Sequence, residues 1–109
     1  MSVILKKAQN LIWQNRSRNG GTKLLLRARE IEASDKIQST IQTSNGHFKS
    51  QILGSSGEMY EVWLFATGKV FCSCAFFDDL EPFQRQGLGC KHLLAHSLRV
   101  VKELRDSAA

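Results

Sequence analysis

The chain has 109 residues, which is enough for one ordinary domain and too few for two. Its formal charge of +5 is uneven, because residues 1–29 hold seven basic and no acidic residues while residues 30–109 hold eight basic and ten acidic ones. The basic character therefore belongs to the N-terminal segment, where a polyanionic partner would bind first. This charge also predicts that part of the segment stays outside the core. A solvated arm, helical or disordered, would explain the same pattern.

The three cysteines cannot all pair within one chain, and no secretory segment is expected before them. The apolar run Val3 to Leu5 is far too short for a signal sequence, and no apolar stretch approaches the roughly 20 residues that span a bilayer. We therefore expect a soluble, cytoplasmic protein in a reducing compartment, without membrane contact. There, clustered cysteines are more often metal ligands than disulfides.

Two N-terminal stretches show apolar residues at helical spacing. The first runs from Ser2 to about Asn15, and the second runs from a capping Thr22 to about Ala33. Between them, the polar, basic stretch 15–21 contains two adjacent glycines and predicts a break. The sequence thus predicts that residues 1–33 form a basic segment of one or two helices.

After Ser34 the apolar period changes from helical to alternating. Asn45 followed by Gly46 is a strong hairpin signal, and further turns are expected at residues 54–57 and 67–68. The predicted strands are residues 37–43, 47–53, 59–65 and 70–74. In the first strand, Ile37, Ser39 and Ile41 should share one side, and in the second Phe48, Ser50 and Ile52 should do so.

Apolar residues return to helical spacing after Lys91. Leu94, Leu98 and Val101 form a stripe that should lie on the sheet in a helix ending near Arg105. The predicted fold class is therefore α+β. An antiparallel meander of three or four strands and a C-terminal helix make up residues 34–109, preceded by the helical segment 1–33.

The cysteines fall into two pairs of ligand-type residues. Cys72 and Cys74 are two residues apart on a predicted strand, so both sulfurs should point to one face. Cys90 should lie where the chain enters the last helix, and Gly87 and Gly89 before it allow a tight approach. Three thiolates and one imidazole form the tetrahedral set that structural zinc prefers. The sequence thus predicts one structural Zn²⁺ bound by Cys72, Cys74, Cys90 and His92, whose removal should unfold the C-terminal half.

Alternative roles exist for these residues. The cysteines could be ordinary core residues and His92 a surface histidine. His96, one helical turn further on, could replace a ligand, support one, or lie at the surface and contact phosphate. An enzyme is not expected, because metal binding uses every cysteine and the chain has no glycine-rich phosphate loop.

The pattern Cys72-x-Cys74, fifteen residues, Cys90-x-His92 resembles the SWIM-type zinc finger, whose signature is CxC…CxH. Ser73, an early Phe76 or Phe77, Gly87 and the run 91–95 also match, and the resemblance covers about residues 27–105. It implies a DNA-binding or protein-interaction module. The chain differs from larger members of the family in having no helicase, nuclease or transposase domain attached. It also carries Asp78, Asp79 and Glu81 between the ligand pairs, and these acids would repel phosphate.

The main functional hypothesis is a zinc-containing accessory protein that binds nucleic acid, DNA more than RNA, which would place it in a nucleus or nucleoid. Trp13 could stack on a base or bury against the second helix. The predicted phosphate contacts are Lys6, Lys7, Arg16, Arg18, Lys23, Arg27 and Arg29.

The alternative is a protein-interaction adaptor. Its binding residues would lie in the loop between the ligand pairs, with at least one phenylalanine packing over the zinc. The large apolar residues of this loop are Phe76, Phe77, Leu80 and Phe83. The first helix could equally pair with a second copy of the chain, so a homo-oligomer stays open.

Overall fold

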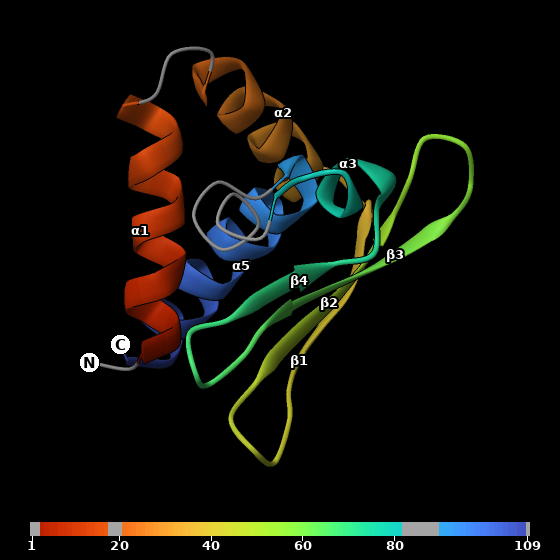
Figure 1. The fold of residues 1–109 in the computed structure, drawn as a ribbon. Coiled ribbons are helices and arrows are strands. Elements are labelled where there is room, and N and C mark those ends of the chain that lie inside the picture. Colours follow the sequence, from red (N-terminus) through yellow and green to blue (C-terminus); the bar gives the residue numbers. More distant parts are fainter. Residues whose placement is uncertain (1–2, 18–20, 82–89, 109) are drawn as a thin grey trace.

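The computed structural model describes residues 3–17, 21–81 and 90–108, and it confirms the α+β class. Four strands form one antiparallel sheet in the order β1-β2-β3-β4, with the helices on one side of it (Figure 1). The elements are α1 (Val3–Ser17), α2 (Gly21–Ala33), β1 (Ile37–Gln42), β2 (Phe48–Leu53), β3 (Met59–Leu64), β4 (Val70–Cys72), α3 (Ala75–Asp78) and α5 (Lys91–Ala108).

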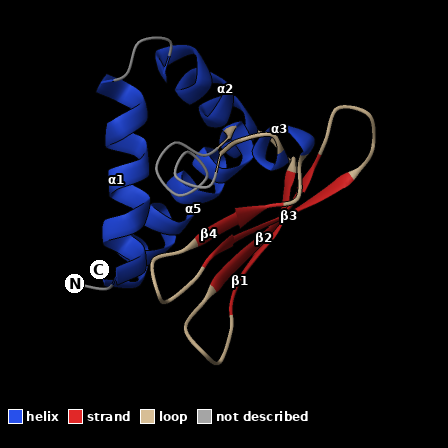
Figure 2. Cartoon of the chain, viewed as in Figure 1, coloured by secondary structure: helices blue, strands red, loops and turns tan. Residues whose placement is uncertain are grey.

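Helix α5 lies against the sheet, and α1 and α2 pack against α5 and against each other (Figure 2). Ile4, Ala8 and Leu11 of α1, at spacings of four and three residues, are buried in the same cluster as the inner face of the sheet. The N-terminal helices therefore belong to the common core, contrary to the expectation drawn from their charge. No helix in the described part of the chain is both long and apolar enough to cross a membrane.

The inner face of β2 is as predicted, since Phe48, Ser50 and Ile52 are all buried. The prediction for β1 is wrong after its first residue. Ile37 pairs with Ile52 whereas Ser39 pairs with Gln51, so the register shifts by one residue between them. An extra residue in one strand exchanges the two faces, which leaves Ser39 and Ile41 exposed on the outer side.

All three hairpin turns end in a glycine with positive φ: 84° at Gly46, 91° at Gly57 and 91° at Gly68. In each turn the glycine N–H donates to the carbonyl three residues earlier, at 2.9, 3.2 and 2.9 Å respectively. Turns of this kind let tightly connected strands keep their right-handed twist. The predicted turns at residues 45–46, 54–57 and 67–68 are thus confirmed.

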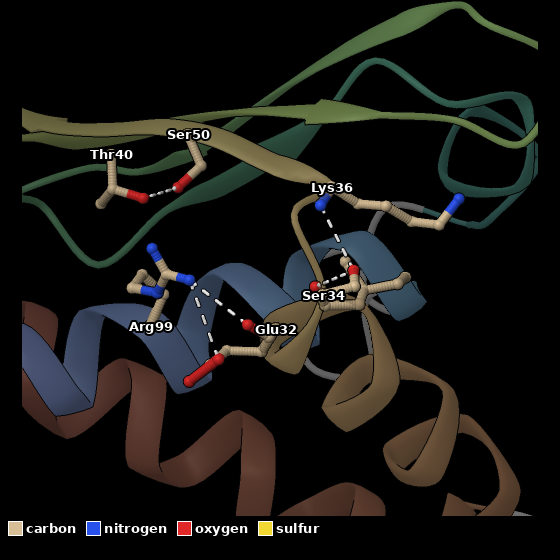
Figure 3. A network of polar contacts seen from close by, with 7 residues as sticks. Glu32, Ser34, Lys36, Thr40, Ser50 and Arg99 are labelled. Atoms are coloured by element: carbon tan, nitrogen blue, oxygen red, sulfur yellow. Dashed lines mark hydrogen bonds and ion pairs between the residues drawn. The ribbon is translucent and has the colours of Figure 1, made fainter.

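Side-chain hydrogen bonds at the end of α2 fix the corner between α2 and β1 (Figure 3). Ser34 Oγ donates to the Ile31 carbonyl at 2.8 Å and accepts the N–H of Lys36 at 3.2 Å. Arg99 of α5 donates to the Glu32 carbonyl at 3.3 Å, and its guanidinium lies 3.8 Å from the Glu32 carboxylate. Carbonyls at the end of a helix lack partners within it, so these contacts stabilise the corner. The Ser34 contact also fixes the position of the Lys36 backbone.

Candidate metal centre

The four predicted ligands come from three neighbouring parts of the fold. Strand β4 ends at Cys72, two residues earlier than predicted, and Cys74 instead precedes the short helix α3. Cys74 nevertheless has extended backbone angles, φ −76° and ψ 155°, so its sulfur still points to the same side as that of Cys72. Cys90 directly precedes α5, and His92 lies in its first turn.

Cys72, Cys74, Cys90 and His92 are all buried, and their ligand atoms lie within 4.8 Å of one another. Sulfurs in a tetrahedral zinc site with Zn–S bonds of about 2.3 Å are about 3.8 Å apart. The cluster is therefore close to the size that one metal ion requires. The structure thus brings together all four residues that the sequence singled out as metal ligands.

Two of the sulfurs also cap helices. The N–H of Phe77 donates to Cys74 Sγ at 3.4 Å, and the N–H of Leu93 donates to Cys90 Sγ at 3.5 Å. In each case the donor lies three residues after the cysteine, in the first turn of the helix. Backbone N–H groups pointing at sulfur favour its charged form, so the local fold prepares both cysteines to act as thiolates.

Three adjacent sulfurs cannot all ionise without a cation. Hydrogen bonding to Cys72 and Cys90 lowers the pKa of Cys74 far below that of an ordinary thiol. Hydrogen bonding to Cys74 and Cys90, with burial added, raises the pKa of Cys72. For Cys90, the Cys72 contact lowers the pKa, but the Cys74 contact and burial outweigh it and raise the pKa to about 12. Without a cation the cluster thus concentrates its negative charge on Cys74, and a dication is what allows the other two thiols to ionise.

His92 provides the test of whether the cluster fits a metal. Its Nδ1 atom is buried and has no hydrogen-bond partner among the described residues. Its ring packs on Tyr60, with ring centroids 4.5 Å apart. A buried polar atom without a partner is costly unless something else binds it. The imidazole lies in the buried cluster with the three sulfurs. A metal ion bound through Nδ1 would satisfy this atom, so the residues fit one bound metal.

Compared with models of protein families, with curated proteins and with solved structures, the chain gives no match.

His96 is not part of the cluster, and the expectation that it lies at the surface is wrong. It is fully buried, and its Nδ1 lies 2.6 Å from Ser50 Oγ while its Nε2 lies 3.1 Å from the Phe48 carbonyl. A carbonyl only accepts, so Nε2 carries the proton and Nδ1 accepts from the Ser50 hydroxyl. His96 therefore joins α5 to β2, and it can contact neither metal nor phosphate.

The loop between the ligand pairs has more structure than predicted, because it begins with α3. Phe77 is buried in the core cluster, whereas Phe76 is exposed and Leu80 is half-buried. Phe83, Gly87 and Gly89 lie outside the described residues. The surface that this loop offers to a partner protein is thus reduced, within the described residues, mainly to Phe76.

The predicted phosphate-binding residues that the structure describes are spread over α1 and α2. Lys6 and Arg16 are exposed on α1, and Lys7 is half-buried, where desolvation lowers its pKa. Arg16 and Arg27 line separate hollows. Lys23, Arg27 and Arg29 are exposed on α2, and Arg18 lies outside the described residues. Trp13 is 63% exposed, so the prediction that it buries against the second helix is wrong.

Two adjacent hollows of about 300 and 290 Å³ lie beside the metal centre, and both are lined by Arg27, Lys91 and His92. Lys36 also lines the first of them. The sequence did not single out Lys36 or Lys91, because both lie in the part of the chain with a net negative charge. Lys36 and Lys91 lie close together because of where the fold places the α2–β1 corner and the start of α5. Their spacing in the sequence does not predict this.

Proposed function

We propose that this protein is a small, zinc-stabilised accessory protein of the SWIM type that binds nucleic acid, DNA in preference to RNA. The main support for this proposal is that Arg27, Lys36 and Lys91 line the same hollow beside the metal centre. These cations come from α2, from the turn before β1 and from the first turn of α5. Glu30 is the one acid among the described residues lining that hollow.

The metal's role in this proposal is structural. Four protein ligands leave no position for a water molecule, so a bound Zn²⁺ would cross-link β4, the start of α3 and the start of α5. Lys91 lies directly between two ligands, Cys90 and His92. Zinc would therefore hold one of the three cations in place, which links metal binding to the proposed phosphate-binding surface.

The geometry suits a phosphate backbone rather than a single small anion. The two hollows share Arg27, Lys91 and His92 in their linings. Lys23 and Arg29 are exposed on the same helix as Arg27. Cations spread along a surface neutralise successive phosphates, giving affinity that is tolerant of sequence and steeply dependent on salt. Tyr60 and the exposed Phe76 line the second hollow and offer aromatic surface to an unpaired base.

The test is fluorescence anisotropy of labelled single- and double-stranded oligonucleotides against the zinc-loaded protein, across a salt series. We expect the double variant Arg27→Glu, Lys36→Glu to bind much more weakly at low salt. Loss of two phosphate contacts should also reduce the slope of log K against log salt by about 1.8 for a duplex.

The matched control is the double variant Lys102→Glu, Arg105→Glu, which changes the net charge by the same amount on a different surface. It should keep the wild-type salt slope, and the zinc content of each variant should be equal. An equal loss in both variants would indicate diffuse attraction without a site. Absence of binding by the wild-type protein at low salt would eliminate the proposed function.

A further inference from the structure

A groove of about 430 Å³ runs between α1 and α5 and shares no lining residue with the hollows at the metal centre. Its floor is apolar. Val101 is buried, and Ile12 and Leu98 are half-buried between the two helices. Trp13 also lines the groove, and 63% of its surface is exposed. A large aromatic residue beside a partly exposed apolar floor is typical of a protein-interaction site.

The rim of the groove is positively charged. Arg16 of α1 and Lys102 and Arg105 of α5 line it, and Asp106 is the one acid among its described lining residues. Arg16 and Arg105 are both exposed, as is Lys102. An apolar floor between basic rims complements a partner that presents an apolar stripe between acidic residues.

The length of the groove suits a helix. From Leu98 to Arg105 the lining residues follow one side of α5 over about 10 Å, which is two helical turns. Ile12 and Arg16 form a second row on α1 at a spacing of four residues. Two packed helices offer a third helix a ready site for side chains at positions i, i+4 and i+7.

We infer that the α1/α5 groove binds an acidic amphipathic helix of a partner protein. A nucleic acid fits less well, because its sugar-phosphate backbone would cover Ile12, Leu98 and Val101 without giving them an apolar partner, and only Trp13 offers a stacking surface. This inference does not depend on the proposed function. Together the two surfaces would let the protein connect a nucleic acid to a second protein.

The test uses a synthetic peptide of roughly 15 residues, a length at which helices become stable in water. It carries leucine at positions i, i+4 and i+7 with glutamate on both sides, and a scrambled peptide of the same composition is the control. NMR spectra of the ¹⁵N-labelled, zinc-loaded protein should show shifts concentrated in residues 9–16 and 98–106. Trp13→Ala, and separately Lys102→Glu with Arg105→Glu, should weaken binding by about tenfold or more.

The control variant Arg27→Glu, Lys36→Glu should keep its affinity for the peptide, whatever its affinity for DNA. Equal binding of the scrambled peptide would show charge attraction alone and overturn the inference. Absence of shifts in the groove would overturn it as well. Shifts of the same residues by oligo-dT, without any by the peptide, would assign the groove to nucleic acid instead.

Discussion

Single side chains decide which histidine joins the sulfur cluster. His92 and His96 lie one turn apart on α5, but His92 reaches the sulfur cluster whereas His96 enters the sheet. Ser50 Oγ, which contacts His96, also lies 2.8 Å from Thr40 Oγ1 (Figure 3). The imidazole therefore ends a chain of hydrogen bonds that crosses β1 and β2. Since every member of that chain has a partner, the buried polar group stabilises the helix–sheet contact without an unpaired atom.

The environment of His96 predicts a pH dependence. Burial lowers its pKa to about 4, whereas in the unfolded chain it titrates near pH 6.5. Between these values the unfolded state binds more protons. The stabilisation is therefore complete above pH 6.5 and decreases as pH falls towards 4, by about 1.4 kcal/mol per pH unit.

Urea unfolding at pH 7.5 and 5.5 measures this effect against His96→Gln, with both proteins zinc-loaded. From pH 7.5 to 5.5 the free energy of unfolding of the wild type should fall by about 1 kcal/mol more than that of the variant. Acid weakens metal binding in both proteins, so the difference between them isolates the effect of His96. Ring ¹⁵N shifts should show the Nε2–H tautomer at neutral pH. An imidazole that titrates near 6.5 in the folded protein would contradict the buried network.

At the scale of elements, the turn between β2 and β3 supports the metal centre through Tyr60. Gly54 begins this turn, and a Cβ at its position would lie 2.6 Å from Tyr60 Cε2 and 3.1 Å from Glu58 Cδ. Tyr60 is held on both sides, since its hydroxyl donates to Glu58 at 2.5 Å and its ring packs on His92. Gly54→Ala should therefore displace the ring that orients His92.

The visible spectrum of the Co²⁺-loaded protein at saturating metal measures this displacement. We expect Gly54→Ala to shift the absorption bands because the imidazole moves. The control is Gly57→Ala in the same turn, where no atom lies within 4 Å of the added Cβ but φ is +91°. It should lower the free energy of unfolding by about 1–2 kcal/mol and leave the spectrum unchanged. A wild-type spectrum for Gly54→Ala would show that Tyr60 does not position His92.

The elements show what sequence patterns can and cannot predict. The helical and alternating periods of apolar residues predict the main helices and strands to within a few residues of their observed ends. The spacing of the two ligand pairs predicts the Cys/His cluster. The faces of β1 were predicted wrongly after Ile37, because a bulge adds a residue that no composition signal marks. The helical cap formed by Cys74 was missed because Cys is not a usual capping residue. The convergence of Lys36 and Lys91 depends on tertiary structure alone.

At the scale of the whole molecule, the metal centre and the N-terminal helices share one core. Cys72, Cys74 and Cys90 belong to the same buried cluster as Leu11 of α1 and Val62 of β3. Zinc in small domains contributes an apparent ~10–16 kcal/mol, which matches or exceeds the ~5–15 kcal/mol stability of a typical domain. Loss of the metal should therefore unfold more than the C-terminal half that the sequence suggested.

Hydrogen exchange during stepwise removal of zinc with a chelator tests this cooperativity. The amides of Leu11 and Val62, one in each layer, should lose protection at the same zinc occupancy and regain it together when zinc is restored. Cys90→Ser should abolish protection at both positions even with excess zinc. Protection of Leu11 that outlasts that of Val62 would show that α1, α2 and their partners fold without the metal. In that case the metal would stabilise only the sheet and the start of α5, and the basic helices would be an independent unit.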